Sequence, residues 1–419
     1  MGPGDDAVGG PRAPGSGARF FRAARAEDPP IPPTGQPLAD TSAPVVVFIT
    51  IDALRADALA DRGRDATWPT LARLRDESAW FTRARSPGSQ TAVSLTATFS
   101  GRTFSELFWA RHGVGSARFE YAAADPTPRL PAMLDEEGID TFKVVGTNFL
   151  ANEFGTASGF ARETLASQGR RHAKAREIEG PLVEALKKVR REPAFFYAHF
   201  MEPHAPYDRG EVKEGSKKER YLSEIAALDE TFDRLLTVLD GPRLRGRAWL
   251  VVSSDHGEAF GEHDSWEHTK TLYDEMIRVP LLVRGPGVVP RVIEEPVTLL
   301  DVGPTVLDLF RLPTPSGWAG QTLVPLLRGD DVALERPILA EGRLRRAIVM
   351  PDGMKVIVDL RRKVVEAYDL TNDQMELVDV WDDGPPGARS RAQVAAAALE
   401  AYYLEREARA PGYRPVYKP

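Results

Sequence analysis

Polar side chains follow two short apolar runs, at positions where α/β proteins bind their ligands. Asp52 comes directly after the run 45–51, and Asp255 and His256 follow the run 249–253. An adjacent Asp and His at the end of a strand can present oxygen and nitrogen ligands to one metal ion. Each segment taken alone also fits a helix cap or a turn. Because the carboxyl ends of parallel strands face one crevice, we expect the three side chains to meet there.

Thr91 stands where a loop is predicted to enter a helix. The segment 86–94 is rich in small and polar residues, and the helix is expected to end near Gly101. At a helix N-terminus the amide groups and the dipole favour an alkoxide or an incoming anion, and a nearby metal would lower the pKa of the hydroxyl further. An isolated threonine at this position would simply be a helix cap.

The histidines are few and unevenly placed. Of the 7 in the chain, His256, His263 and His268 fall within one short stretch. His204 lies just past the run 194–200 and is enclosed by two prolines, Pro203 and Pro206, which restrict the backbone around it. This clustering favours metal binding or acid–base chemistry over solvated surface side chains.

The elements that position these residues are apolar runs of strand length separated by helical patterns. The runs show no polar alternation, which is typical of strands buried on both faces. Two segments, 182–189 and 221–239, place apolar residues at helical spacing. We therefore predict an α/β fold, a mostly parallel central sheet flanked by helices. The runs are 45–51, 142–145, 194–200, 249–253 and 279–283.

Changes in composition and in hydrophobic periodicity divide the chain into three regions. Residues 1–42 are rich in Pro, Gly, Ala and charge, and we interpret them as a disordered tail or linker. Residues 43–326 hold the alternating strands and helices of the predicted catalytic domain. Residues 327–419 form a small C-terminal α+β subdomain, with a hairpin over 347–358 and a final helix over 394–404.

Composition excludes several classes of protein. The chain has 419 residues, of which 42% are hydrophobic, so it can bury a substantial core. A formal charge of −7 argues against a nucleic-acid partner, and we expect Arg343, Arg345 and Arg346 to form a solvated strand edge. The absence of cysteine excludes disulfides and thiolate chemistry. No apolar run is long enough to span a bilayer and no signal peptide is visible, so we expect a cytoplasmic protein or one exported after processing.

The ordered motifs resemble the sulfatase branch of the alkaline phosphatase superfamily. The resemblance extends over Val45–Asp379, and its most specific part begins at Asp255. The segments that carry it are Ser254-Asp255-His256-Gly257-Glu258, Gly261-Glu262-His263, Leu272-Tyr273-Asp274-Glu275, Arg278-Val279-Pro280-Leu281, Asp301-Val302-Gly303-Pro304-Thr305 and Glu366-Ala367-Tyr368-Asp369-Leu370.

This resemblance implies a divalent metal site and a covalent mechanism. Asp52, Asp255 and His256 match metal-ligand positions, and Thr91 matches the position of the nucleophile, which also binds the metal. A histidine ligand favours Zn²⁺ or Mn²⁺ over Ca²⁺, which prefers oxygen ligands.

The same resemblance assigns residues to the substrate side. His204 matches the family histidine that contacts the anionic group of the substrate. His268 or Lys270 falls at the leaving-group side and would protonate the leaving oxygen. The implied substrate is a small-molecule, glycan or lipid-head-group ester of phosphate or sulfate.

Four departures from the family pattern bear on the reaction. Sulfatases carry a Cys or Ser at the position of Thr91 and oxidise it to formylglycine, but a threonine would give a ketone. Leu95 replaces a stabilising arginine, Thr147 replaces a lysine, and Ile51-Asp52 supplies one carboxylate in place of two. The departures favour the phosphodiesterase and phosphoethanolamine-transferase relatives, in which an unmodified threonine attacks, so we expect a metal-dependent hydrolase or transferase of phosphate or sulfate esters. The alternatives are a sulfatase proper and a catalytically silent family member that binds an anion.

Overall fold

The computed structural model describes residues 29–111, 120–169, 172–268 and 271–409. Within these ranges the main sheet has eight strands in the order β13-β2-β12-β9-β1-β8-β6-β7. The five strands from β9 to β7 are parallel, and β12 runs antiparallel to both of its neighbours. The strands are β1 (Val45–Ile51), β2 (Ala79–Phe81), β6 (Asp140–Val145), β7 (Arg162–Leu165), β8 (Ala194–Phe200), β9 (Ala248–Ser253), β12 (Leu281–Arg284) and β13 (Arg291–Ile293).

Strand β1 occupies the middle of the sheet and is buried along its whole length. Its side chains alternate between two separate cores. Val47 and Ile49 point into one core, whereas Val46 and Phe48 point into the other. The prediction of a strand buried on both faces is therefore confirmed, and so is the mostly parallel sheet.

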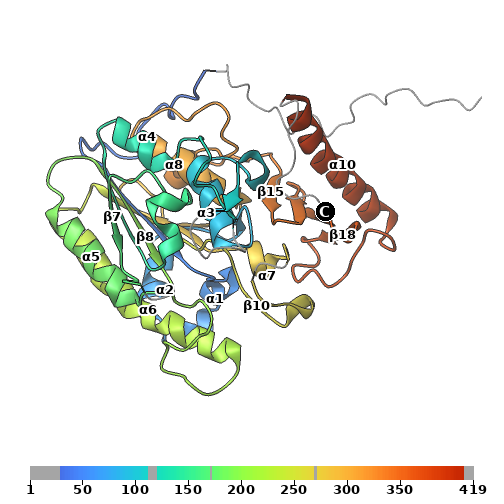
Figure 1. The fold of residues 1–419 in the computed structure, drawn as a ribbon, viewed down its shortest axis with the longest axis horizontal. Helices are drawn as coiled ribbons and strands as arrows, with labels where there is room; N and C mark the ends of the chain where they lie inside the picture. Colours follow the sequence, from blue (N-terminus) through green and yellow to red (C-terminus); the bar gives the residue numbers. More distant parts are fainter. Residues whose placement is uncertain (1–28, 112–119, 170–171, 269–270, 410–419) are drawn as a thin grey trace, which may run out of the picture.

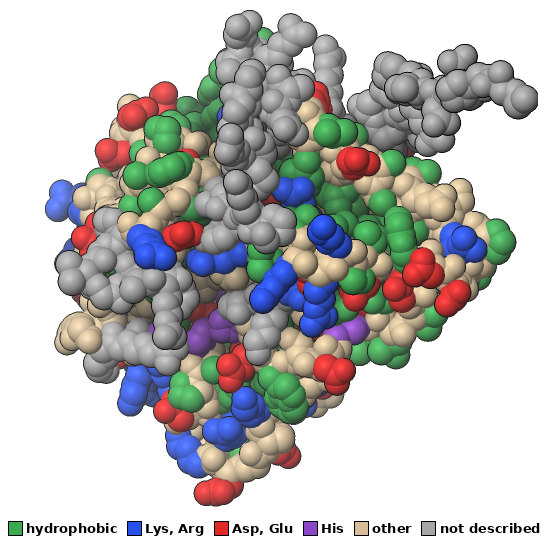
Figure 2. Space-filling model, turned by 45° about the vertical axis from the view of Figure 1, so that its right-hand side comes forward, with side chains coloured by type: hydrophobic (Ala, Val, Ile, Leu, Met, Phe, Trp, Pro, Cys, Tyr) green, Lys and Arg blue, Asp and Glu red, His purple; other side chains and the backbone are tan. Residues whose placement is uncertain are grey.

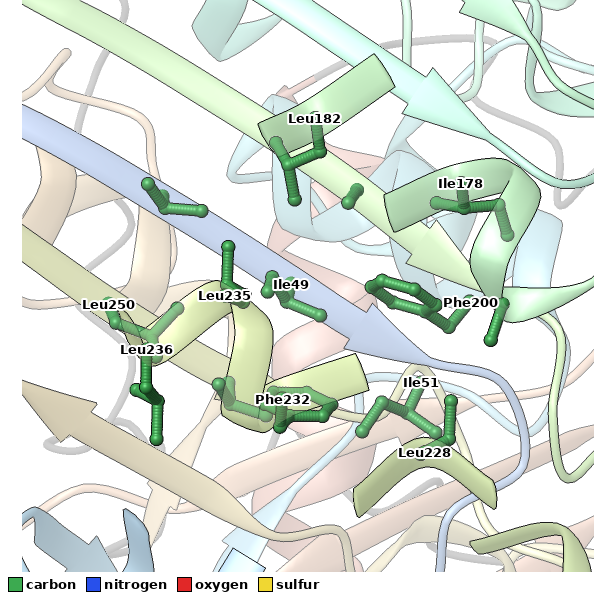
Figure 3. Close-up of a cluster of buried hydrophobic side chains, with 14 of the residues drawn as sticks. Ile49, Ile51, Ile178, Leu182, Phe200, Leu228, Phe232, Leu235, Leu236 and Leu250 are labelled. Carbon is green, nitrogen blue, oxygen red and sulfur yellow. The ribbon is translucent and has the colours of Figure 1, made fainter. Parts of the chain in front are cut away.

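Helices cover the two faces of the sheet (Figure 1). One face carries α1 (Ala56–Ala60), α2 (Pro69–Asp76), α5 (Ala175–Lys188) and α6 (Lys217–Leu239). The other carries α3 (Thr91–Ser100), α4 (Leu130–Glu136), α8 (Val302–Leu309) and α9 (Val324–Arg328). Figure 3 shows how the first core is filled: Phe232 and Leu235 of α6 and Leu182 of α5 surround Ile49 on β1.

Helix α3 is almost entirely buried, and three of its hydroxyl groups are satisfied within the helix. The hydroxyls of Thr96, Thr98 and Ser100 each donate to the carbonyl four residues earlier, at 2.6–2.9 Å. The helix ends at Gly101, where φ is +62° and an added Cβ would lie 2.2 Å from the ring of Trp318. Only glycine fits this close approach. The helix predicted after residue 91 is thus confirmed.

A second, antiparallel sheet forms the C-terminal part, with the strand order β15-β16-β17-β18. Its strands are β15 (Ile338–Glu341), β16 (Arg345–Val349), β17 (Met354–Asp359) and β18 (Val364–Asp369), and α10 (Pro386–Arg409) packs on one face. The predicted hairpin corresponds to β16 and β17. The predicted final helix is present but begins earlier than expected. The domain boundary after residue 326 stays a prediction.

A buried charge network joins this sheet to the region of the main sheet. Arg85 binds both oxygens of Asp274, at 3.0 and 2.6 Å. The ammonium group of Lys355 on β17 lies 2.9 Å from Asp274 and 2.7 Å from Glu376. Opposite charges inside the protein are tolerated here because two cations meet two carboxylates.

Short elements complete the described chain. They are β3 (Ala84–Arg85), β4 (Ala110–Arg111), β5 (Glu120–Tyr121), β10 (Ala259–Phe260), β11 (Trp266–Glu267), β14 (Val297–Thr298) and α7 (Asp274–Ile277), with 3₁₀ turns η2 (Arg62–Arg64), η3 (Phe104–Glu106), η4 (Asn148–Leu150), η5 (Asn152–Phe154), η6 (Glu262–Asp264) and η7 (Leu299–Asp301).

The N-terminal tail predicted for residues 1–42 is described from residue 29 onward. There Ile31 pairs with Thr314 through two backbone hydrogen bonds of 2.8 Å, and the Thr34 hydroxyl donates to Asp308 at 2.9 Å. This stretch is therefore packed against the catalytic region. Among the described residues, none of the helices has the length and apolar character needed to cross a bilayer.

Candidate active site

Asp52, Asp255 and His256 meet at the carboxyl ends of β1 and β9. One ligand atom from each lies within 4.8 Å of the others, and all three side chains are buried. The Nε2 atom of His256 is 3.6 Å from Asp52 Oδ1 and 3.4 Å from Asp255 Oδ2. Its Nδ1 atom faces the Gly257 carbonyl at 2.9 Å, so Nδ1–H donates there and Nε2 keeps its lone pair. The three side chains that were predicted to meet do so.

The electrostatics of this cluster are those of a cation site. Burial and the negative charge of Asp52 raise the pKa of Asp255 to about 7. Burial also disfavours the charged form of Asp52, but the positive charge of His204 and a hydrogen bond from His199 hold its pKa well below the usual range. Burial and the charge of His268 lower the pKa of His256 to about 4. A neutral imidazole beside two carboxylates suits a divalent metal.

Two buried oxygens support the same conclusion. Asp52 Oδ1 and Asp255 Oδ2 have no hydrogen-bond partner among the described residues, and each is the oxygen of its carboxylate that approaches His256 Nε2. Buried carboxylate oxygens without a partner are costly unless a cation satisfies them. The donor set of two oxygens and one nitrogen therefore fits a divalent metal ion.

Thr91 is the first residue of α3 and its side chain reaches this cluster. Its hydroxyl oxygen lies 3.2 Å from His256 Nε2, and its hydrogen bond to Asp255 lowers the pKa of that carboxyl group. Only 7% of the residue is exposed, so the hydroxyl is held in a dry site at a helix N-terminus. Leu95, one turn further along, is fully buried in the core and points no polar group toward the site.

Two further histidines, His204 and His268, lie beside the cluster. The rings of His256 and His268 are stacked with centroids 4.4 Å apart, and His204 contacts His268 at 4.9 Å. The Nδ1 atom of His268 is 3.3 Å from Glu258, and that of His204 is 2.7 Å from the Ala205 carbonyl. The structure thus brings His204 and His268 to the cluster of Asp52, Asp255 and His256. Lys270 lies outside the described residues.

Two further residues at the site were missed by the sequence argument. His199 Nε2 is 3.3 Å from Asp52, and its Nδ1 is 2.7 Å from Thr50, which pairs with it across β1 and β8. In the sequence, His199 could have been recognised as a polar residue near the end of the otherwise apolar run 194–200. His172 contacts the ring of His204 at 4.9 Å and lies in an irregular segment without any local signal.

His263 belongs elsewhere, although its position in the sequence grouped it with His256 and His268. Its Nδ1 atom is 2.9 Å from Glu275, its Nε2 atom is 2.9 Å from the carbonyl of Glu376, and its ring stacks on Tyr273 at 3.7 Å. Burial lowers the pKa of His263, but the hydrogen bonds to Glu376 and Glu275 outweigh it and raise that pKa. The residue helps to join the catalytic region to the C-terminal sheet.

The fold and the site together define an α/β protein with Asp, His and a helix-initiating Thr at the carboxyl edge of a mostly parallel sheet. The family model for sulfatases matches residues 44–312, which includes every candidate residue of the site. The chain therefore belongs to the sulfatase family.

Curated relatives share part of this region. Choline-sulfatase of Rhizobium meliloti is 28% identical over 197 residues, which cover 45% of this chain and 38% of that protein. An ulvan-active sulfatase of Formosa agariphila is 31% identical over 31% of this chain and 26% of its own. Human arylsulfatase K is 32% identical over 25% of this chain and 20% of its own. The matches span about two fifths or less of these relatives.

Solved structures show the same fold over nearly the whole chain. A phosphonate monoester hydrolase from Silicibacter pomeroyi has a TM-score of 0.69 at 17% identity and covers 87% of this chain and 95% of its own. An alkaline phosphatase superfamily protein from Vibrio parahaemolyticus has a TM-score of 0.62 at 16% identity, covering 90% of each chain.

Proposed function

We propose that this protein is a metal-dependent hydrolase of sulfate or phosphate esters in which the unmodified Thr91 is the nucleophile. The observation that carries the proposal is the place of its hydroxyl, 3.2 Å from His256 Nε2 and at the first residue of α3. Asp52, Asp255 and His256 would hold the metal. When bound, a divalent metal there lowers the pKa of the Thr91 hydroxyl and polarises the ester.

The covalent step transfers the anionic group to threonine. The Thr91 oxygen forms a bond to phosphorus or sulfur, and the bond to the alcohol oxygen breaks. The developing negative charge lies at the N-terminus of α3, where backbone amides favour an anion. Water then cleaves the threonine ester and releases the anion.

His268 and His204 serve the substrate side in this proposal. Burial lowers the pKa of His268, but the hydrogen bond and charge of Glu258 outweigh it and raise that pKa, so the imidazole carries a proton to give to the leaving oxygen. The Nδ1–H group of His204 donates to the Ala205 carbonyl, and with a second proton on the ring its Nε2–H group would donate to a non-bridging oxygen of the ester.

The substrate class follows from the family and from the nucleophile together. Relatives named as choline-sulfatase and ulvan-active sulfatase support a sulfate ester of a small molecule or glycan. A phosphonate monoester hydrolase shares the fold and supports a phosphorus centre. Thr91 does not yield formylglycine, which favours direct attack by the hydroxyl over the chemistry of a sulfatase proper.

The test is nitrophenol release from 4-nitrophenyl phosphate, bis(4-nitrophenyl) phosphate and 4-nitrophenyl sulfate, with Mn²⁺ or Zn²⁺. We expect metal-dependent turnover that falls at least about 10³-fold in Thr91→Ala. Thr98→Ala is the matched control, since that hydroxyl bonds only within the helix, to the Ser94 carbonyl at 2.9 Å. Equal rates for Thr91→Ala and the wild type would refute the covalent mechanism.

A catalytically silent protein that binds an anion is the second candidate. The burial of Leu95 favours it, because no cation stands there to support the transition state. This candidate predicts that Mn²⁺ and sulfate or phosphate bind with no turnover of any of the three esters, whereas turnover of any one of them excludes it.

A further inference from the structure

His199 is a histidine to which the proposed reaction assigns no step. It lies on β8, and none of its surface is exposed. Figure 2 shows histidine side chains at the surface beside Lys and Arg side chains, and the fully buried His199 is not among them. Burying an imidazole costs free energy unless its ring nitrogens find hydrogen-bond partners. The partners of His199 therefore indicate what the residue does.

Both ring nitrogens of His199 have a partner. Nε2 lies 3.3 Å from Asp52 Oδ2, and Nδ1 lies 2.7 Å from the hydroxyl oxygen of Thr50. An ionised carboxylate can only accept a hydrogen bond, so the ring proton is on Nε2 and is donated to Asp52. Nδ1 of the neutral ring then accepts a hydrogen bond from the Thr50 hydroxyl. The two neighbours thus fix the tautomer and the orientation of the ring.

The chain of hydrogen bonds continues to a tyrosine. The hydroxyl of Tyr197 lies 2.7 Å from that of Thr50, and burial raises the pKa of Tyr197 well above its ordinary value, so the phenol keeps its proton. Since Thr50 donates to His199, it accepts from Tyr197. Thr50 pairs with His199 across β1 and β8, and Tyr197 stands two residues earlier on the same face of β8. Three fully buried side chains therefore direct one N–H group at Asp52.

The hydrogen bond from His199 leaves one oxygen of Asp52 for a metal ion. Oδ2 is engaged, whereas Oδ1 is buried, has no hydrogen-bond partner among the described residues and lies 3.6 Å from His256 Nε2. Asp255 is divided in the same way: its Oδ1 accepts from the Ala53 amide at 3.3 Å, and its unpartnered Oδ2 lies 3.4 Å from His256 Nε2. Each carboxylate thus offers a single oxygen to the site.

We propose that His199 is a positioning residue that holds Asp52 with only Oδ1 toward the metal, and that it thereby makes the site prefer Zn²⁺ to Ca²⁺. The inference rests on the proposed function, because it takes Asp52, Asp255 and His256 as the metal ligands. Ca²⁺ takes about 6–8 oxygen ligands, often both oxygens of one carboxylate. Zn²⁺ takes about four ligands and accepts nitrogen among them. Two carboxylates limited to one oxygen each, beside an imidazole nitrogen, suit Zn²⁺.

The test measures the Kd of Zn²⁺ and of Ca²⁺ for the full-length protein, Zn²⁺ by competition with a chromophoric chelator and Ca²⁺ by calorimetry. His199→Leu should weaken Zn²⁺ binding by about 10–100-fold, because Asp52 is no longer held in place. Ca²⁺ binding should weaken less, since the released Oδ2 becomes a further oxygen ligand, so the preference for Zn²⁺ should fall at least about tenfold. His199→Gln should keep the Zn²⁺ Kd within about threefold, because its amide nitrogen can donate from the place of Nε2.

Thr50→Val tests the same chain of hydrogen bonds without altering the histidine, and it serves equally if His199→Leu does not fold. It removes the hydroxyl on which Nδ1 of His199 depends, so it should lower the preference for Zn²⁺ about three- to tenfold. Thr141→Val is the matched control: Thr141 is fully buried on β6 of the same sheet, and its hydroxyl accepts from the Ala161 amide at 2.9 Å. Its loss should leave both Kd values within about twofold.

The outcomes separate the positioning role of His199 from the proposed function. Equal losses of Zn²⁺ and Ca²⁺ affinity in His199→Leu and in Thr50→Val would refute the role, and so would a fall in preference of the same size in Thr141→Val. A His199→Gln protein that behaves like His199→Leu, or a wild type that prefers Ca²⁺, would also refute it. A wild type that binds neither metal would overturn the metal site and the role together. Preference for Zn²⁺ that depends on His199, in a protein that hydrolyses none of the esters, would support the role and refute the proposed hydrolase.

Discussion

Replacing Lys355 by methionine should destabilise the protein by about 3–5 kcal/mol at pH 8, because it leaves a buried charge uncompensated. The ammonium group is fully buried and lies 2.9 Å from Asp274 and 2.7 Å from Glu376. Arg85 still binds both oxygens of Asp274 in the variant. The loss therefore falls mainly on Glu376, which would be an ionised carboxylate in the interior without a cation.

The loss of unfolding free energy in Lys355→Met should depend on pH, and the direction of that dependence follows from the pKa of Glu376. Burial and the charge of Asp274 raise its pKa from 4.5 to about 7, while Lys355 acts in the opposite direction. A carboxyl group whose pKa is raised by folding costs stability only where it is ionised. That cost is absent below the unfolded pKa and complete above the folded one. Without Lys355 the pKa rises further, so the variant should lose less at pH 5 than at pH 8.

The assay is equilibrium unfolding in guanidinium chloride at pH 5 and pH 8, followed by far-ultraviolet circular dichroism. Lys187→Met is the matched control: that side chain pairs with Glu184 at 3.2 Å and is 56% exposed, so its loss should cost less than about 0.5 kcal/mol. A loss below about 1 kcal/mol for Lys355→Met, or an equal loss at both pH values, would refute the reasoning.

Three further outcomes follow from buried groups. Phe232→Ala should lower the free energy of unfolding by about 3–5 kcal/mol, because Phe232 is buried in the core. Leu377 is 76% exposed, so Leu377→Ala should change the free energy of unfolding by less than about 0.5 kcal/mol. Similar losses in the two variants would contradict the assignment of Phe232 to the core. Burial raises the pKa of Glu224 to about 7, so its ionised form costs stability at pH 8. Glu224→Gln should therefore raise the melting temperature at pH 8 and have little effect at pH 4. A larger effect at pH 4 than at pH 8 would contradict the raised pKa of Glu224. Removing bound metal with a chelator should lower the melting temperature, and adding Mn²⁺ should restore it, because Mn²⁺ at a hundredfold excess over its Kd stabilises the folded state by about 2.7 kcal/mol. The variant Asp255→Asn should lose this response to Mn²⁺, whereas the exposed Asp233→Asn should keep it. A full response in Asp255→Asn would exclude Asp255 as a metal ligand.

The central sheet and the metal-ligand cluster were accessible from sequence because one physical rule governs both. Strands buried on two faces appear as unbroken apolar runs, as in Val45–Ile51. Parallel strands then bring whatever follows them to the same edge, which is how Asp52 and Asp255 come together. Thr91 was accessible for a related reason, since a loop rich in small residues before a buried helix marks a helix N-terminus.

Other parts of the site depend on contacts that no local pattern encodes. His199 was hidden because its strand is otherwise apolar, and only the register of β1 with β8 places it against Asp52. His263 lay near the other histidines in sequence, yet the turn that contains it faces the C-terminal sheet.

The central position of β1 in the sheet has a consequence for folding during synthesis on the ribosome. Thr50 on β1 and His199 on β8, which share a hydrogen bond in the finished sheet, are 149 residues apart, and Ala53 is 202 residues from its partner Asp255. At about 5–20 residues per second, β1 waits roughly 7–30 s for β8 and longer for β9. During that time the apolar segment Val45–Ile51 has neither neighbour, and it is a strand that aggregates readily when exposed. The strand that directly precedes Asp52 is thus a part of the nascent chain that a chaperone would protect from aggregation.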